Sequence, residues 1–188
     1  MSLPKQWRAR PPRASVPPQL IPWLTDEGSL TARIRARCDR FAVRVLRQAP
    51  GIPHADEASL FGLRPGCMVW VREVLLVADG VPVVYARSIL PRGHVRGAWH
   101  LFNGIGARPL GAALFADPGI SREPLSCARL DRRDKRYHRA LAGAGAGAGA
   151  GLAVPPAALW ARRSMFRLRE RALLVSEIFL PAIARLSR

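Results

Sequence analysis

The 188-residue sequence lacks the cysteine and histidine patterns that hold together disulfide-rich or metal-bound domains. Its three cysteines, Cys38, Cys67 and Cys127, lie far apart and form no CxxC pair. An odd number of cysteines without framework spacing indicates a reducing compartment and not a disulfide scaffold. The four histidines show no metal-ligand spacing with one another or with the cysteines. We therefore expect neither a metal site nor a disulfide.

Long apolar runs are also absent, which excludes a membrane-spanning helix. The longest run, at 172–181, contains a charge and is shorter than the ~20 residues that cross a bilayer. The N-terminus is basic, but no apolar core of a secretory signal follows it. We expect a cytoplasmic protein, which we take to be a monomer.

Acidic residues are scarce. The chain has 13 Asp and Glu against 30 Lys and Arg, a formal net charge of +17, and only Lys5 and Lys135 are lysines. Such a charge suggests a nucleic-acid-binding protein. The arginines are spread along the chain, however, and no zinc-finger, RNA-recognition or helix-turn-helix motif accompanies them. We expect no specific nucleic-acid partner, only non-specific adhesion to polyanions at low salt.

With 49% hydrophobic residues, the chain is long enough to bury a core as one domain. Residues 1–18 hold five prolines and four basic residues and predict a flexible arm ahead of a single domain at 19–188. The charged and Ala/Gly-rich stretch at 130–158 predicts a flexible loop insertion between strands. Alternating Ala and Gly buries too little surface to offset the entropy lost on ordering it.

The most informative segment is a β-hairpin predicted at 68–90. Two β-branched runs flank Asp79-Gly80, a dipeptide typical of a two-residue hairpin turn. With these two residues as the loop, Arg72 lies opposite Arg87 on one face of the hairpin. Like charges in that position repel, unless an anion with two acidic groups lies between them. The alternative is that this face is solvated and both arginines point into water.

A second hairpin is predicted from strands at 160–169 and 172–180, with its turn at Glu170-Arg171. Its second strand is apolar except for Ser176 and Glu177, and Glu177 shares a face with Val175. A carboxylate in such a strand either forms an ordinary salt bridge with an arginine or belongs to a site. Both interpretations stay open on the residues alone.

Six blocks of the sequence together resemble the chorismate pyruvate-lyase family of ubiquinone biosynthesis. They occur in the family's order, at compatible spacings, and cover most of residues 20–181. The blocks are WLTDEGSLT at 23–31, VWVREVLLVADG at 69–80, ARS at 86–88, RPLG at 108–111 with LF at 114–115, LWARRS at 159–164, and LLVSEIFLP at 173–181. The basic arm and the Ala/Gly insertion depart from the compact family pattern, at places where loops lengthen without touching a site.

The resemblance implies an α+β fold, in which an antiparallel β-sheet with helices on one face encloses a buried ligand pocket. It also implies a cofactor-independent lyase that eliminates pyruvate from chorismate to give 4-hydroxybenzoate, the first committed step toward ubiquinone. Arg72 matches the family arginine that binds the ring carboxylate, and Glu177 matches a carboxylate at the ring hydroxyl end. Leu30 and Leu110 match pocket-lining residues. Leu30 stands where a well-known member has methionine, an apolar exchange of similar volume that a core tolerates.

These residues suggest separate roles in binding the two ends of chorismate. Chorismate carries two carboxylates, and two guanidinium groups in a water-poor pocket would bind both. Our hypothesis is that Arg72 anchors the ring carboxylate and Arg87 holds the enolpyruvyl carboxylate. Glu177 then hydrogen-bonds the ring hydroxyl or acts as acid/base.

Two further points stay open. Arg162 and Arg163 either serve the site or pair with acidic neighbours such as Glu73, and pairing is favoured. The alternative function is a non-catalytic effector-binding domain of the same fold, of the kind that follows a DNA-binding winged helix in some bacterial regulators. We do not favour it, because only the short arm precedes the predicted fold.

Overall fold

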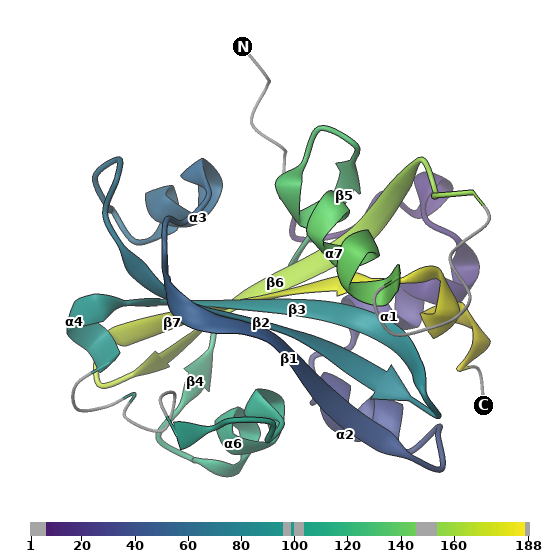
Figure 1. The fold of residues 1–188 in the computed structure, drawn as a ribbon, viewed down its shortest axis with the longest axis horizontal. Helices are drawn as coiled ribbons and strands as arrows, with labels where there is room; N and C mark the ends of the chain where they lie inside the picture. Colours follow the sequence, from purple (N-terminus) through teal and green to yellow (C-terminus); the bar gives the residue numbers. More distant parts are fainter. Residues whose placement is uncertain (1–6, 96–98, 100–103, 146–153, 187–188) are drawn as a thin grey trace.

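The computed structural model describes residues 7–95, 99, 104–145 and 154–186. Its centre is a seven-stranded antiparallel sheet in the order β1-β2-β3-β7-β6-β4, in which β5 also pairs with β6 (Figure 1). The strands are β1 (Phe41–Gly51), β2 (Val69–Ala78), β3 (Val81–Pro91), β4 (Ser121–Arg122), β5 (Ser126–Asp131), β6 (Ala158–Leu168) and β7 (Arg171–Phe179).

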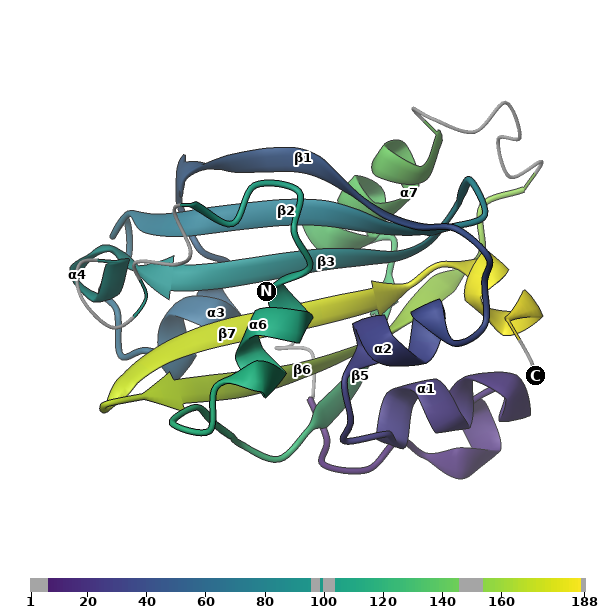
Figure 2. The ribbon, with the colours of Figure 1, turned by 90° about the horizontal axis from the view of Figure 1, so that it is seen from below.

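Helices cover both faces of the sheet. They are α1 (Ile21–Thr25), α2 (Leu30–Arg35), α3 (Ala55–Leu60), α4 (Arg92–Val95), α6 (Leu110–Ala116) and α7 (Lys135–Gly145), with 3-10 turns at Arg13–Ser15, Pro18–Leu20 and Pro181–Arg185. Helices α1, α2 and α6 lie on one face, and α3 and α7 lie on the other (Figures 1 and 2). The predicted α+β class is confirmed, while the helices are divided between two faces where the resemblance implied one.

Local sequence signals account for several of these elements. The Ser29 side chain accepts a hydrogen bond from the backbone N–H of Ala32 and so caps α2, as expected of a serine before a helix. Pro124 cannot donate to a ladder, and it lies between the short strands β4 and β5. Among the described helices, none is long and apolar enough to span a membrane.

Both predicted hairpins form, but each differs in detail from the prediction. The β6–β7 turn uses Arg169 and Glu170, both with positive φ, one residue earlier than expected. In the β2–β3 hairpin the register shifts between Leu76 and Val77, so that Leu76 pairs with Val84 and leaves Val83 as the extra residue of a bulge. The bulge follows Pro82, which has no N–H to donate, and the Val83 carbonyl accepts instead from the Leu180 N–H at 3.0 Å.

The predicted pairing of Arg72 with Arg87 is therefore wrong. Arg72 pairs with Ser88, and Arg87 pairs with Glu73. Because side chains alternate along a strand, the one-residue bulge turns Arg87 to the face opposite Arg72. The expected like-charge conflict does not arise.

The Ala/Gly stretch is helical where the structure describes it, which corrects the expected flexible insertion over 135–145; residues 146–153 lie outside the described part. Helix α7 packs on the sheet through buried Tyr137, Ala140 and Gly143. A Cβ atom at Gly143 would lie 2.8 Å from Leu46 Cδ1 and 3.6 Å from the Leu75 methyl groups. The small residues thus allow a close approach of helix to sheet.

The N-terminal arm is likewise anchored from residue 7 onward, whereas residues 1–6 lie outside the described part. The Trp7 indole donates to Asp56 at 2.9 Å, and the Arg163 guanidinium stacks 4.1 Å from the Trp7 ring centroid. Arg8 and Cys127 exchange backbone hydrogen bonds across a β-bridge. The expectation of a flexible arm is wrong for this part.

Candidate functional site

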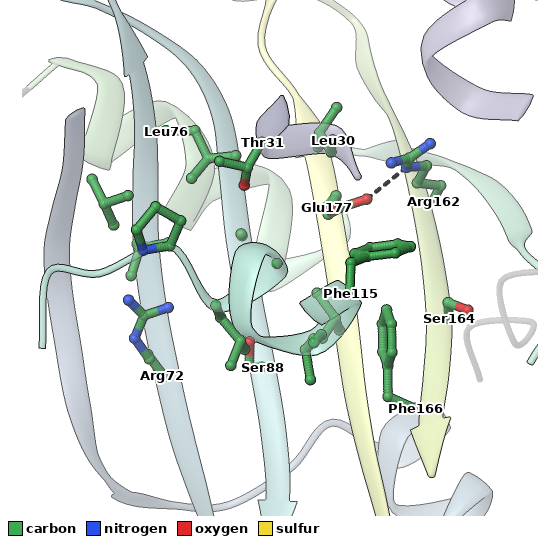
Figure 3. Close-up of a pocket in the computed structure, with 18 of the residues that line it drawn as sticks. Leu30, Thr31, Arg72, Leu76, Ser88, Phe115, Arg162, Ser164, Phe166 and Glu177 are labelled. Atoms are coloured by element: carbon green, nitrogen blue, oxygen red, sulfur yellow. Dashed lines mark hydrogen bonds and ion pairs between the residues drawn. The ribbon is translucent and has the colours of Figure 1, made fainter. Parts of the chain in front are cut away.

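A cavity lies between the sheet and helices α2 and α6 (Figure 3). Its empty volume is about 590 Å³, including the part open to solvent, a size typical of small-molecule sites. Its polar lining residues are Thr31, Arg72, Ser88, Arg122, Arg162, Ser164 and Glu177, and the apolar lining includes Leu30, Leu110, Phe115 and Phe166. Strands β2, β3, β7 and β6, which are neighbours in the sheet, contribute through alternate residues, as the period of two requires.

Arg72 supplies a buried positive charge to this cavity. Its side chain is only 2% exposed, and its Nη2 donates to the backbone carbonyls of Gly106 and Arg108 at 2.9 and 3.0 Å. Its Nε has no partner, and none of the described carboxylates forms an ion pair with it. Burial lowers the pKa of Arg72 to about 10. A buried cation without a counter-ion is costly, and the cost is offset if an anion binds beside it.

Glu177 supplies a carboxylate to the same cavity. It pairs across the sheet with Arg162, whose Nε donates to Glu177 Oε2 at 2.6 Å (Figure 3). Arg162 is in turn fixed by Nη1, which donates to the carbonyls of Trp23 at 2.8 Å and Asp26 at 2.6 Å. The ion pair that sequence reasoning left open is thus formed, and it lies in the cavity wall. Arg162 both forms an ion pair and lines the cavity.

The sheet sets the separation between Arg72 and Glu177. Arg72 pairs with Ser88, and Ser88 pairs with Val175, two residues before Glu177. Two strand spacings and one step of two residues place the Cα atoms of Arg72 and Glu177 about 12 Å apart. The two charged side chains thus line the cavity from β2 and β7, which β3 separates in the sheet.

Apolar side chains from α2 and α6 face the sheet across this space. Leu30 and Leu110, the expected lining residues, both lie in the cavity wall and are 3% and 9% exposed. Gly111 allows α6 to approach α2, because a Cβ atom there would lie 3.2 Å from Thr31 Oγ1. The result is a slot with apolar walls and charged ends.

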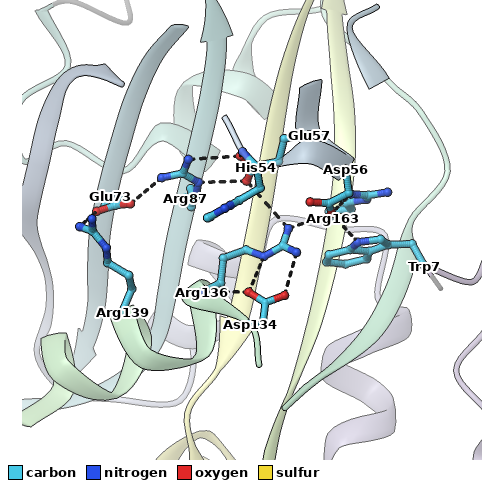
Figure 4. Close-up of polar contacts among 10 residues, drawn as sticks. All are labelled: Trp7, His54, Asp56, Glu57, Glu73, Arg87, Asp134, Arg136, Arg139 and Arg163. Carbon is cyan, nitrogen blue, oxygen red and sulfur yellow. Dashed lines mark hydrogen bonds and ion pairs between the residues drawn. The ribbon is translucent and has the colours of Figure 1, made fainter. Parts of the chain in front are cut away.

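Arg87 does not belong to this cavity, which corrects its assignment as a substrate-binding residue. On the opposite face it donates through Nε and Nη2 to both carboxylate oxygens of Glu57, at 2.9 and 3.2 Å, and through Nη1 to Glu73 at 2.5 Å (Figure 4). Burial alone would lower the pKa of Arg87, but the ion pairs outweigh it and raise the pKa. The charge of Arg87 is neutralised by carboxylates, whereas the charge of Arg72 has no carboxylate partner among the described residues.

The same buried network ties other segments to the sheet (Figure 4). Arg163, on the face opposite the cavity, donates to Asp56 at 2.9 Å, which confirms the structural pairing favoured for it, with Asp56 in place of Glu73. Arg136 of α7 donates to Asp134 and also to Asp56 at 3.0 Å. Through these contacts α3, α7 and the N-terminal arm are held together.

Sequence reasoning missed Arg122 and the two cavity serines, Ser88 and Ser164. The alternation of Arg162, Ser164 and Phe166 along β6 is a signal that could have identified Ser164. Arg122 comes from the two-residue strand β4 and carried no such signal. In the described part of the chain, no group of three His, Cys, Asp or Glu could hold a metal ion.

The fold and cavity together define an α+β protein with a cavity lined by a buried arginine that has no carboxylate partner in the described part of the chain. The chain matches the chorismate lyase family over residues 5–187 and belongs to it. It is 66% identical over 180 residues to a probable chorismate pyruvate-lyase of Aromatoleum aromaticum, covering 96% of this chain and 94% of that protein. A protein of the same name from Azoarcus sp. strain BH72 is 59% identical over 183 residues, covering 95% and 92%.

Solved structures of low sequence identity share the fold. The C-terminal domain of the histidine utilization repressor from Pseudomonas syringae aligns with a TM-score of 0.55 and 12% identity, covering 79% of this chain and 97% of that one. The effector domain of PhnF from Mycobacterium smegmatis aligns with a TM-score of 0.54 and 17% identity, covering 82% and 89%. At these identities the likeness concerns the fold alone.

Proposed function

We propose that this protein is a chorismate pyruvate-lyase, which eliminates pyruvate from chorismate and leaves 4-hydroxybenzoate. The observation that carries the proposal is the buried and uncompensated Arg72 guanidinium in a cavity whose opposite end holds Glu177. Membership of the chorismate lyase family and relatives named probable chorismate pyruvate-lyases support the substrate.

In this proposal the ring of chorismate lies in the apolar slot between Leu30 and Leu110. Its ring carboxylate accepts charge-assisted hydrogen bonds from Arg72, which restores the missing counter-charge. The ring hydroxyl, on the opposite side of the ring, donates to Glu177. Arg162 engages Oε2 of that carboxylate and leaves Oε1 for the hydroxyl.

The reaction breaks the ether bond between the ring carbon and the enolpyruvyl oxygen, and that oxygen becomes the carbonyl of pyruvate. The hydrogen on the ring carbon that bears the hydroxyl moves to the enolpyruvyl methylene carbon, which becomes the pyruvate methyl group. The electron pair of the broken C–H bond completes the aromatic ring. Atoms and electrons balance with no oxidant, reductant or group donor, so we propose that the enzyme needs no cofactor.

The protein's contribution is then mainly to orient the substrate. Fixing both ends of the ring holds the transferred hydrogen near the methylene carbon, and such positioning accounts for much of the rate enhancement in comparable reactions. As the ether bond breaks, negative charge develops on the departing oxygen and is stabilised by nearby cationic donors. Glu177 is the group placed to orient the hydroxyl, or to accept the ring proton if the steps separate.

We further propose that the product feeds ubiquinone synthesis and that the protein acts in the cytoplasm as a single-domain monomer. The substrate and product are small anions, and the proposed reaction requires no nucleic acid.

Purified protein incubated with chorismate tests the proposal. Chromatography should detect 4-hydroxybenzoate and pyruvate in equal amounts, and Arg72→Met should abolish their formation. The fold likeness to effector domains favours one alternative, a binding domain without activity. Stabilisation by 4-hydroxybenzoate without any turnover would favour that alternative, and the absence of both effects would contradict the assignment of the site.

A further inference from the structure

A second arginine in the cavity, Arg122, is held by aromatic rings. It lies on β4 opposite Phe166, and its guanidinium carbon is 5.3 Å from the centroid of the Phe166 ring and 5.4 Å from that of Phe115. The two rings meet edge to face at 5.9 Å. Their faces stabilise a cation over them and keep the side chain directed along the cavity wall.

The polar partners of Arg122 fix its position without neutralising it. Its Nε donates to Ser164 Oγ at 3.1 Å, and its Nη1 donates to the carbonyl of Glu27 at 2.6 Å, with Gly28 O at 3.5 Å. The Ser164 hydroxyl donates its own hydrogen to Glu123 O at 2.5 Å, so its oxygen is free to accept from Arg122. None of the described carboxylates forms an ion pair with this guanidinium. Burial lowers the pKa of Arg122.

The other arginines near the sheet centre are already neutralised. Arg162 is paired with Glu177, and Arg87 is paired with Glu57 and Glu73 on the far face. Among the described cavity-lining residues, this leaves Arg72 and Arg122 as the cations without a carboxylate partner.

The sheet places these two cations at opposite walls. Arg72, Ser88, Val175 and Ser164 form one row across β2, β3, β7 and β6, and all four line the cavity. Three strand spacings separate the Cα atoms of Arg72 and Ser164 by about 14 Å. Arg122 is hydrogen-bonded to Ser164 at the far end of this row. Two guanidinium groups held at the two ends of this row suit a ligand whose two carboxylates lie on different sides of one ring.

We propose that Arg122 is a second anion subsite, which binds the enolpyruvyl carboxylate of chorismate while Arg72 binds the ring carboxylate. The inference rests on the proposed function and deepens it. The enolpyruvyl carboxylate leaves with pyruvate, so 4-hydroxybenzoate retains only the contact with Arg72. Arg122 therefore distinguishes substrate from aromatic product, and it replaces Arg87 in the role that the sequence suggested.

A pair of stable probes tests the subsite without turnover. The dianion 3-(carboxymethoxy)-4-hydroxybenzoate has a carboxylate on the ether, and the monoanion 3-ethoxy-4-hydroxybenzoate lacks it. Calorimetric titration of the intact protein should show that Arg122→Met weakens binding of the dianion at least tenfold and changes that of the monoanion by less than about threefold. Methionine retains the apolar stem on the two phenylalanines, so the loss would report the charge. Arg122→Lys should restore part of the dianion affinity.

The matched control is Arg167→Met, which removes an exposed arginine paired with Glu123, the residue after β4, outside the cavity. It should leave both affinities unchanged. If Arg122→Met weakened both probes equally, or neither, the subsite would be refuted. Should that variant fail to fold, Ser164→Ala removes the acceptor of Arg122 Nε and should weaken binding of the dianion alone. Equal affinity of the unsubstituted protein for both probes would also refute the inference. Turnover of chorismate is measured separately, so the subsite and the proposed activity can fail independently.

Discussion

The same substitution at two neighbouring arginines should produce opposite results. Arg72 and Arg87 are 2% and 4% exposed, yet Arg87 is bonded to two buried carboxylates and Arg72 only to two backbone carbonyls. The Arg87→Met substitution removes the cation to which Glu57 and Glu73 are bonded. Breaking a buried ion pair from one side costs about 3–5 kcal/mol, which lowers the melting temperature of a chain of this length by roughly 10 °C or more.

For Arg72→Met the opposing contributions nearly cancel. Burial lowers the pKa of Arg72 to about 10, which corresponds to a cost of roughly 3 kcal/mol for holding the charge. Removing the side chain relieves that cost and loses two charge-assisted hydrogen bonds, each contributing about 1.5–3 kcal/mol. We expect the stability of the unliganded protein to fall by no more than about 3 kcal/mol, while binding and turnover are lost.

Urea denaturation with and without 4-hydroxybenzoate measures both quantities. A ligand at about 100 times its Kd stabilises the folded state by about 2.7 kcal/mol. This gain should be present in the unsubstituted protein and absent in Arg72→Met. Equal destabilisation by the two substitutions would show that Arg72 is compensated in the folded state, and a normal ligand response in Arg72→Met would show that it does not bind the carboxylate.

Three further outcomes follow from single contacts. Glu177→Gln removes the anionic acceptor for the ring hydroxyl but keeps its shape, so kcat/KM for chorismate should fall about tenfold to a thousandfold in steady-state assays; an unchanged value would contradict the role given to Glu177. Gly143→Leu should cost about 1–3 kcal/mol in urea denaturation, because even a Cβ atom at this position lies 2.8 Å from Leu46 Cδ1, while Ala142→Leu on the exposed side of α7 should be nearly neutral. Benzoate, whose carboxylate is ionised throughout, should bind about tenfold more weakly near pH 11 than near pH 8, because Arg72 loses its proton with a pKa of about 10. An arginine in the unfolded chain keeps its proton to higher pH, so the stability cost of the buried charge diminishes as the pH rises above about 10. A pH-independent affinity for benzoate would contradict the assignment of Arg72.

Local signals in the sequence predicted the two hairpins, and the family resemblance implied the α+β class. They could not predict contacts between segments far apart in the chain. The ion pair between Arg87 and Glu57 joins a strand to a helix 30 residues earlier, and no local sequence pattern at either residue predicts it. The prediction for α7 failed because low-complexity composition was taken as evidence against packing, whereas a helix that must approach a sheet closely requires small residues on its inner face.

The position of Arg87 shows why the cavity could be predicted only in part. Arg72, Glu177, Leu30 and Leu110 all line the cavity. Arg72 and Glu177 follow an unbroken alternation in their strands, and Leu30 and Leu110 each begin a helix that covers the cavity. Arg87 lies beyond the Val83 bulge, and one extra residue inverts every side chain after it. Pro82 was visible in the sequence, but a proline indicates a break in the ladder without indicating which residue will be left unpaired.

Electrostatics and backbone geometry select the same register. Without the bulge, Arg87 and Tyr85 would enter the cavity, and Ala86 and Ser88 would face Glu57 and Glu73. Two buried carboxylates would then lose their closest cation, at a cost of several kcal/mol, and a second charge would enter the cavity beside Arg72 on the same hairpin. The bulge avoids both. It keeps one cation in the hairpin's cavity face free for an anion and commits the other to holding α3 and α7 against the sheet, so binding and stability depend on different arginines and can be altered separately.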